Sequence, residues 1–346
     1  MLTVPSHLTP LMIGLGFVLG AIVGSFLNVV GLRFLNDQSI VMPSSRCPNC
    51  HRPLTAFENI PILSYLLLRG QCLHCKDPIS MQYPLVEMAT GLLFAFTFWS
   101  FGLSLQTLFL LFLISNLMVI TITDFRESLI FQVNSLPLIP AGLIYSALNL
   151  AGRGGDGIPI DMGIVAFTIP DAFISALLGV FLALIFFEGL ILLSEAVFGT
   201  EGFGHGDTHL MMGAGAFLGW ELTVVALLLG FIVQSVPAIP MLMIQWIQKK
   251  DYLSLGSITG GVVFGILPMF ITLWGLPNPV TIGLVLASIV LSLVCLVVFL
   301  RQTRQSQSFT YMPLGPSLIV GILVAIFWGQ EVLGFLTQTL FTTPAA

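Results

Sequence analysis

The stretch LQTLFLLFLISNLMVITITD, residues 105–124, decides the class of the fold, because no charged residue interrupts it before the final Asp124. A helix of about twenty mainly apolar residues is long enough to cross the hydrocarbon core of a bilayer. We therefore expect a transmembrane helix over residues 105–123. An ionisable residue at the edge of such a span is costly to keep there, so Asp124 indicates a functional site.

The composition of the whole chain places this helix in a membrane protein. The 346 residues are 56% hydrophobic and 8% charged, and their mean hydropathy is +1.02. A soluble domain carries about 25% charged residues. Only helices and closed barrels satisfy their backbone groups in lipid, and the strand-length alternation of a barrel is absent. The sequence thus predicts an all-α polytopic protein that is surrounded by the lipid bilayer and has no nucleic-acid partner.

Similar apolar runs predict a bundle of about ten transmembrane helices. The first run stays in the protein, because residues 1–10 contain no Lys or Arg and so lack the basic region of a signal peptide. The least certain division separates 208–220 from 222–246, since the first of these is short for a span. The expected spans are residues 11–31, 85–103, 105–123, 133–151, 171–197, 208–220, 222–246, 255–275, 279–300 and 314–337.

The basic residues predict how these spans are oriented. With ten spans and an outside N-terminus, ten of the eleven Lys and Arg residues fall on the cytoplasmic side, and only Arg153 lies outside. An excess of Lys and Arg in cytoplasmic loops is the usual pattern, whereas joining 208–246 into one span would break it. We expect a multi-pass protein of the bacterial inner membrane, with the loop over 152–170 outside.

Residues 32–84 are polar and carry four of the five cysteines. Two C-x-x-C pairs, Cys47-Pro-Asn-Cys50 and Cys72-Leu-His-Cys75, stand 21 residues apart, a spacing close to that of paired zinc knuckles. Four thiolates close a tetrahedral Zn²⁺ site and make the ion structural. A small loop-rich segment buries too little apolar surface to be stable alone, so it needs a bound metal or a similar cross-link. The alternative is two unrelated C-x-x-C pairs with a redox role, but the βαβ pattern of a redox fold is absent around them. Thiols in a cytoplasmic loop stay reduced, so disulfides are not expected.

A second acid, Asp207, stands directly before an apolar helix in Gly202-Phe-Gly204-His-Gly206-Asp207. On the ten-span topology Asp124 and Asp207 both lie at the cytoplasmic membrane edge, so they can face one another. Two carboxyl groups that share a site do not both ionise; the ionised one activates a water and the protonated one polarises a carbonyl. Gly202, Gly204 and Gly206 allow unusual backbone angles and the close approach of a substrate backbone.

These acids also have other interpretations. Asp207 suits the N-cap of the following helix, and Asp124 could form an interfacial ion pair with Arg126. Glu188, the deepest of the remaining acids, is either a buried hydrogen-bonded residue or a proton relay. A transporter or channel in which Asp124 and Asp207 relay protons is the alternative function; the glycines beside Asp207 and the absence of matched broken helices favour a protease. A zinc metalloprotease is excluded, because the chain has no H-E-x-x-H motif.

Further motifs accompany the acids and the cysteines. They are Gly20-Ala-Ile-Val-Gly24-Ser-Phe-Leu-Asn28, Ser45-Arg-Cys-Pro-Asn-Cys50, Asn59-Ile-Pro61-Ile-Leu-Ser64-Tyr-Leu-Leu-Leu-Arg69-Gly, Tyr83-Pro-Leu-Val-Glu87, Gly204-His-Gly206-Asp207 and Pro313-Leu-Gly315-Pro316. Together they make the chain similar to the type IV prepilin peptidases, over roughly residues 11–246 and 311–330. The G-x-G-D motif is one that this family shares with presenilin-type proteases, and the last motif resembles the family's F-G-P.

The resemblance implies that Asp124 and Asp207 are the catalytic pair and that the four clustered cysteines bind zinc. It implies a membrane-embedded aspartyl endopeptidase that cuts the short basic leader from prepilins and pseudopilins at the cytoplasmic face. It further implies N-methylation of the new N-terminal residue with S-adenosylmethionine, an activity associated with the cytoplasmic loop.

The resemblance also divides the chain into domains. We expect a first transmembrane helix at 11–31, the zinc-stapled cytoplasmic loop domain at 32–84 and the catalytic bundle at 85–246. Residues 247–310 are expected to be an inserted pair of spans, and 311–346 the final helix and tail.

The chain departs from the family's pattern at three places near these motifs. Ile130-Phe131-Gln132 stands where the family has I-P-D, and Gln71 replaces a common Arg. His209 replaces a Lys two residues after the second acid. Because histidine is largely neutral at pH 7, a fixed positive charge is not expected there.

Overall fold

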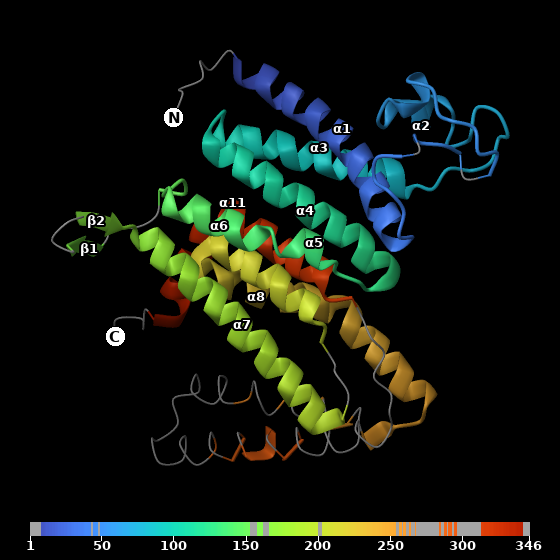
Figure 1. The fold of residues 1–346 in the computed structure, drawn as a ribbon. Helices are drawn as coiled ribbons and strands as arrows, with labels where there is room; N and C mark the ends of the chain where they lie inside the picture. Colours follow the sequence, from blue (N-terminus) through green and yellow to red (C-terminus); the bar gives the residue numbers. More distant parts are fainter. Residues whose placement is uncertain are drawn as a thin grey trace. The chain divides into compact units, whose positions relative to one another are not determined.

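The computed structural model describes residues 8–42, 44–47, 49–152, 158–161, 166–199, 203–253 and 313–341, with scattered residues between 256 and 295. Helices make up most of these residues (Figure 1). They are α1 (Thr9–Leu35), α2 (Leu63–Leu67), α3 (Gln82–Phe101), α4 (Leu105–Glu127), α5 (Gln132–Ser135), α6 (Leu138–Ala147), α7 (Asp171–Phe198), α8 (His205–Gln248) and α11 (Gly315–Phe341), with a 3-10 turn at Phe57–Asn59. A short antiparallel hairpin pairs β1 (Ile158–Asp161) with β2 (Ala166–Ile169).

Six of the described helices are long and apolar enough to cross a membrane, namely α1, α3, α4, α7, α8 and α11. The expected helical membrane fold is thus confirmed, but the count of ten spans is not. The expected spans 255–275 and 279–300 lie mostly outside the described residues. Residues 133–151, expected as one span, contain the shorter helices α5 and α6 instead. Pro137 separates the two, because proline lacks the N–H that would continue the first helix.

The chain divides into two compact units. The first contains Met1–Glu188, His205–Phe231 and Pro313–Ala346, and the second contains Gly189–Gly204 and Ile232–Met312. The contacts described below lie within the first unit.

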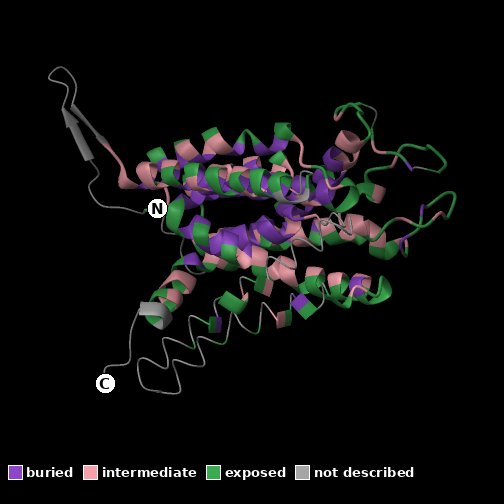
Figure 2. Ribbon diagram, turned by 90° about the horizontal axis from the view of Figure 1, so that it is seen from below, coloured by how far each residue is buried: buried purple, intermediate pink, exposed green. Residues whose placement is uncertain are grey.

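The core of the first unit forms where α1, α3 and α4 face one another. Small residues let helices approach closely in lipid, and a Cβ added to Gly20 of α1 would lie 2.6 Å from the Thr90 carbonyl oxygen of α3. Buried residues follow these inner faces in Figure 2, while the outer faces are exposed. The buried residues of this cluster are Leu27, Val30, Phe94, Leu111, Ile114, Met118 and Val119.

Helix α8 is interrupted at Gly219. A straight helix of its 44 residues would be about 66 Å long at 1.5 Å per residue, roughly twice the hydrocarbon core of a bilayer. Gly219 has φ 73° and ψ 169°, which is not helical and which only glycine adopts readily. The interruption falls between the two expected spans 208–220 and 222–246.

Contacts on either side of Gly219 show that the chain reverses there. At the start of α8, a Cβ added to Gly206 would lie 2.6 Å from Ile130. Beyond the interruption, a Cβ added to Gly230 would lie 3.0 Å from Leu318 of α11. Leu318 is one helical turn from Gly315, and a Cβ added to Gly315 would also lie beside Ile130. Residues 206 and 230 are therefore at the same end of the bundle. α8 thus behaves as two antiparallel helices, as the division of 208–246 requires.

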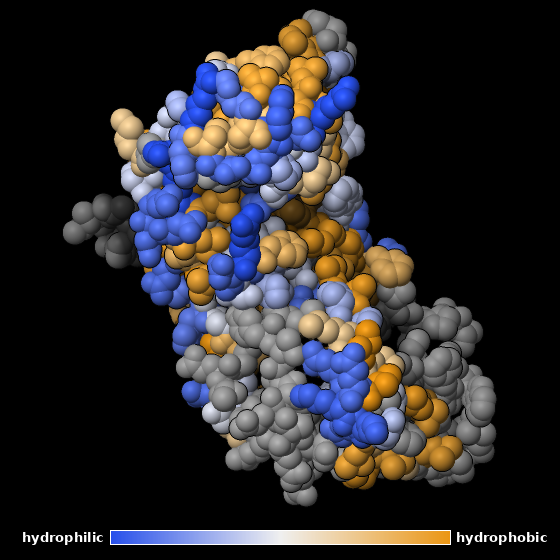
Figure 3. Space-filling model, turned by 90° about the vertical axis from the view of Figure 1, so that its right-hand side faces the viewer, coloured by the Kyte–Doolittle hydropathy of each residue, from blue (hydrophilic) through white to orange (hydrophobic). Residues whose placement is uncertain are grey.

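Residues 36–81 between α1 and α3 form an extramembrane segment, here called the cysteine loop. Hydrophilic residues cover much of this loop, with apolar residues between them, when the molecule is viewed from the side that carries α2 (Figure 3). Glu87 of α3 attaches the loop to the bundle, because its buried carboxyl group accepts a hydrogen bond of 2.7 Å from the Ile62 N–H.

Candidate functional site

Asp124 lies at the C-terminal end of α4 and is almost fully buried, with 3% of its surface exposed. The helix ends three residues later, at Glu127, because Ser128 takes the left-handed conformation (φ 53°) and donates its N–H to the Asp124 carbonyl oxygen at 2.9 Å. The following segment then returns across the helix end to Ile130. This arrangement encloses the Asp124 carboxyl group.

Asp207 lies in the first turn of α8 and is also buried, with 4% exposed. The N-cap of this helix is Gly204, whose backbone is extended (φ −89°, ψ 143°). The interpretation of Asp207 as the N-cap is therefore wrong. An acid in the first turn is instead stabilised by the positive end of the helix dipole.

The two acids belong to one neighbourhood around Ile130. A Cβ added to Gly206, the residue before Asp207, would meet the Ile130 side chain at 2.6 Å. A Cβ added to Gly315 of α11 would lie 2.5 Å from Asp124 Oδ2 and 3.3 Å from the same Ile130 side chain. The start of α8 and the start of α11 thus both lie beside Ile130, and the start of α11 also touches the Asp124 carboxyl group. Gly202, the third glycine expected in the site, lies outside the described residues.

The Oδ2 atom of Asp124 is buried and has no hydrogen-bond partner among the described residues. Arg126, the expected ion-pair partner, lies elsewhere: its Nε and one terminal nitrogen donate to Gln82 Oε1 at 2.9 and 2.6 Å. The interpretation of Asp124 as half of an ion pair with Arg126 is therefore not supported in the described part of the chain.

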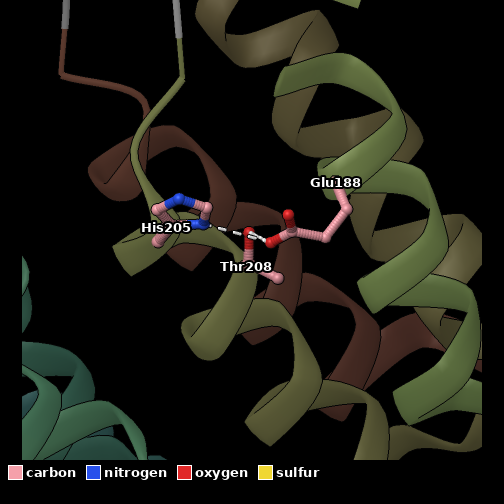
Figure 4. Close-up of polar contacts among 3 residues, drawn as sticks. All are labelled: Glu188, His205 and Thr208. Carbon is pink, nitrogen blue, oxygen red and sulfur yellow. Dashed lines mark hydrogen bonds and ion pairs between the residues drawn. The ribbon is translucent and has the colours of Figure 1, made fainter. Parts of the chain in front are cut away.

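Glu188 of α7 contacts the first turn of α8 (Figure 4). Its Oε1 accepts a hydrogen bond from His205 Nδ1 at 3.1 Å and from Thr208 Oγ1 at 3.4 Å. His205 is the variable residue of the G-x-G-D motif, and Thr208 follows Asp207. The sequence identified Glu188 as an unusual acid, but its partners could not be found without the pairing of α7 with α8. His209 has a buried Nδ1 without a partner among the described residues.

The four clustered cysteines, Cys47, Cys50, Cys72 and Cys75, lie together as expected. Their sulfur atoms are all within 4.8 Å of one another, and the Sγ atoms of Cys47 and Cys75 are 3.7 Å apart. Tetrahedral Zn²⁺ with Zn–S bonds of about 2.3 Å places its sulfur ligands about 3.8 Å apart. All four cysteines are free. The residues therefore fit a four-thiolate metal site.

The two halves of the cluster have the same local fold. In each half the first cysteine donates its N–H across the turn, Cys47 to the Arg52 carbonyl and Cys72 to the Asp77 carbonyl. Backbone N–H groups of Cys75 and His74 lower the pKa of the Cys72 thiol to about 7, which favours the metal-binding thiolate. Although a backbone hydrogen bond at Asp77 opposes it, desolvation and the neighbouring thiols raise the pKa of Cys75 to about 12.

Comparisons with known proteins agree with this site. Residues 18–101 match the bacterial Peptidase A24 N-terminal domain, and residues 111–239 match the type IV leader peptidase family. No solved structure matches the chain.

Three relatives are each named prepilin leader peptidase/N-methyltransferase. The protein from Myxococcus xanthus is 37% identical over 241 residues, which are 70% of this chain and 66% of the relative. The protein from Stutzerimonas stutzeri is 35% identical, over 66% of this chain and 80% of the relative. The protein from Neisseria gonorrhoeae is 32% identical, over 75% of this chain and 92% of the relative. The chain therefore belongs to the type IV leader peptidase family.

Proposed function

We propose that this protein is a membrane-embedded aspartyl endopeptidase that removes the leader from type IV prepilins and pseudopilins and then N-methylates the new N-terminus. The relatives carry both activities in their name. The observation that carries the proposal is the buried, unpartnered Oδ2 of Asp124 beside the helix start that bears Asp207. A buried polar atom without a partner is uncommon and requires an explanation. In this proposal the partner of Asp124 Oδ2 is the reacting water or the carbonyl oxygen of the substrate.

The two acids have different tasks because they share one proton. The ionised carboxylate takes a proton from a water molecule, whose oxygen attacks the carbonyl carbon of the scissile peptide bond. The protonated acid donates a hydrogen bond to the carbonyl oxygen. When the tetrahedral intermediate collapses, the C–N bond breaks and the leaving amine takes up a proton from the pair.

The backbone at the start of α8 supports binding of an extended substrate. The first N–H groups of a helix have no intrahelical partner, and Gly204 directly before them is extended. A substrate strand that pairs with this backbone holds its scissile carbonyl beside Asp207.

The cysteine loop has a structural role in this proposal. Cys47, Cys50, Cys72 and Cys75 would hold one Zn²⁺ that staples the loop, with no position left open for catalysis. S-adenosylmethionine would supply the methyl group. Both acids and the loop would face the cytoplasm, with the N-terminus outside, as the Lys and Arg distribution favours. A proton-coupled transporter, the alternative function, has no support from the matched families.

A direct assay tests the proposal. The full chain in lipid nanodiscs receives a prepilin-like substrate with its leader and its apolar helix, and the product is analysed by mass spectrometry. We expect loss of the leader and the mass gain of one methyl group. Cleavage that persists in an Asp124→Asn/Asp207→Asn double variant would place the catalysis elsewhere.

A further inference from the structure

Helix α2 of the cysteine loop exposes an apolar side. Leu63, Leu66 and Leu67 stand three and four residues apart, which places them on one face of the helix. Their side chains are 56%, 64% and 65% exposed. Tyr65 points to the other side, where its hydroxyl donates to the Ile79 carbonyl oxygen at 3.4 Å. Exposed apolar residues gathered in this way on an extramembrane segment indicate an interaction surface.

The residues before α2 extend this surface. Phe57 and Ile60 are exposed as well, and the five residues are together called the α2 face: Phe57, Ile60, Leu63, Leu66 and Leu67. A helix as short as α2 is not stable in water by itself. It therefore depends on packing, and the described part of the loop leaves its leucines uncovered.

The attachment of the loop sets the depth of α2. The N–H of Ile62, directly before α2, donates to the Glu87 carboxyl group at 2.7 Å. Glu87 lies in the second turn of α3, about 7.5 Å along the helix from its first residue, Gln82. Because helical side chains point back toward the N-terminus, Ile62 lies beside the first two turns of this membrane-capable helix.

The segment before α2 also lies along α1. Asn59 and Pro61 line one cavity together with Phe26. Phe26 is nine residues before the end of α1, or about 13 Å along the helix. It is 54% exposed and so lies on the side of α1 that would face lipid. The start of α2 is therefore beside the outer surface of two membrane-capable helices and not beyond their ends.

The charge around α2 is positive, although the chain as a whole is acidic. Residues 32–84 contain five Lys and Arg residues and three Asp and Glu residues, so their net charge is +2, whereas the whole chain has −5. Arg69 stands two residues after α2. Basic residues beside an apolar helix face favour contact with anionic lipid headgroups.

We propose that the α2 face binds the interface of the lipid bilayer, with its leucines among the first acyl carbons and Arg69 beside the lipid phosphates. The apolar face of an interfacial helix lies about 5–10 Å deep in this boundary, which agrees with the depth that Glu87 gives to Ile62. The cysteine loop is thus held on the membrane surface and not in solution. This inference goes beyond the proposed function, because neither cleavage nor methylation is needed for it.

Photo-crosslinking in a membrane tests the proposal. The photo-reactive residue benzoylphenylalanine replaces Leu66 in the full chain, which is placed in nanodiscs of phosphatidylethanolamine and phosphatidylglycerol. Asn49 receives the same replacement as the matched control, because it is an exposed polar residue of the same loop. We expect several-fold more lipid adducts at position 66 than at position 49, measured by mass spectrometry of the loop peptides.

The other occupants of the α2 face give different products. Cross-links from position 66 to a second copy of the chain, without lipid adducts, would make the face an interface between copies and overturn the proposal. Equal lipid labelling at both positions, or none at position 66, would overturn it too. Lipid adducts in a protein that does not cleave prepilin would leave this inference standing and refute the proposed function instead.

A triple variant provides a second measurement. Leu63→Gln/Leu66→Gln/Leu67→Gln should release the loop from the bilayer, so that limited proteolysis of residues 36–81 in nanodiscs becomes several-fold faster. The metal content should equal that of the wild type, which shows that the loop still folds. Unchanged proteolysis with unchanged metal content would contradict the proposal. If the variant loses its metal, the cross-linking result decides, since it leaves the three leucine positions otherwise intact.

Discussion

Gly315 lies directly against the carboxyl group of Asp124, although the two residues belong to the last and the third of the membrane-capable helices. A Cβ added to Gly315 would be 2.5 Å from Asp124 Oδ2, closer than real Cβ atoms approach an oxygen. Only glycine therefore leaves room for this oxygen and for anything that reacts at it. The motif Pro313-Leu-Gly315-Pro316 is thus part of the candidate active site.

Gly315→Ala should reduce cleavage strongly while the protein still folds. The added methyl group must displace either the Asp124 carboxyl group or Ile130, and a misplacement of about 1 Å at a catalytic group can cost on the order of 10²-fold in rate. Gly334→Ala in the same helix is the matched control, because a Cβ there meets nothing within 4 Å. The measurement is the cleavage rate in nanodiscs with thermal stability read in parallel. Equal rates for the two variants would mean that the contact with Asp124 is unimportant.

Asp124→Asn and Asp207→Asn should each abolish cleavage without unfolding the protein. An amide cannot exchange the proton that the pair needs to switch between its two protonation states. Asp37→Asn is the control, since Asp37 is exposed and its left-handed φ of 51° suits Asn equally well. The assay is leader removal by mass spectrometry on monodisperse protein. Substantial cleavage by either single variant would remove that residue from the pair.

The candidate acids and the cysteine cluster could be predicted because their signals are local. Asp124 stands out because it directly follows the uncharged apolar run 105–123, whatever that run packs against. Two C-x-x-C turns fix the positions of their own sulfurs, so four cysteines at this spacing predict a cluster before the fold is known. The division of 208–246 was expected from the distribution of Lys and Arg, and the structure places it at Gly219, whose backbone angles are not helical.

Contacts between distant helices could not be predicted from the sequence. Arg126 was expected beside Asp124, its neighbour on the same helix, but Gln82 of α3 binds it instead. The same holds for Glu188, whose link to His205 depends on the antiparallel pairing of α7 and α8. In that pairing, Gly179 and Gly215 let the two backbones approach within van der Waals contact. Such pairings depend on which helices pack against one another in the bundle. The spacing of apolar residues along one helix does not identify its neighbours.

Replacing Cys47 with Ser should release the metal and loosen the cysteine loop. Metal binding supplies folding free energy to a segment this small, and three thiolates hold Zn²⁺ less tightly than four. We expect about one zinc per chain in the wild type by elemental analysis, much less in Cys47→Ser, and faster proteolysis of residues 36–81. Cys295→Ser is the control, because Cys295 lies outside the cluster. Purified wild-type protein without zinc would count against the metal site.

Glu188→Leu should lower kcat more than it raises KM, because Glu188 acts through His205 and Thr208 on the turn that bears Asp207. We expect a loss of roughly five- to tenfold, as for one partly exposed hydrogen bond to a charged group. Glu188→Gln retains an acceptor oxygen and should recover part of the activity. Glu195→Leu, at an exposed glutamate of the same helix, should have no effect.

A double-variant measurement tests whether Glu188 and His205 act as a pair. If they do, the loss in Glu188→Leu/His205→Ala should be smaller than the product of the two single losses. Fully multiplicative losses would show that Glu188 supports the helix in general and does not position this turn.

Substrate recognition should depend on the small residue before the cut and on the apolar helix after it, and less on the charge of the leader. Gly206 and Gly315 leave little space beside the acids, because a Cβ at either would come within 2.6 Å of its neighbours. A bulky residue before the cut should therefore block cleavage while the substrate still inserts into the membrane.

The positive charge of the leader should contribute little binding free energy at the cysteine loop, because α1 and the loop carry basic residues of their own. These are Arg33, Arg46, Arg52, Arg69 and Lys76. The measurement compares the cleavage rates of nanodisc-inserted substrates that have Gly or Phe before the cut, and of a substrate whose leader charges are neutralised. The change to Phe should slow cleavage more than the loss of leader charge. If soluble leader peptides without the apolar helix are cleaved equally well, docking within the bilayer is not how the enzyme selects its substrate.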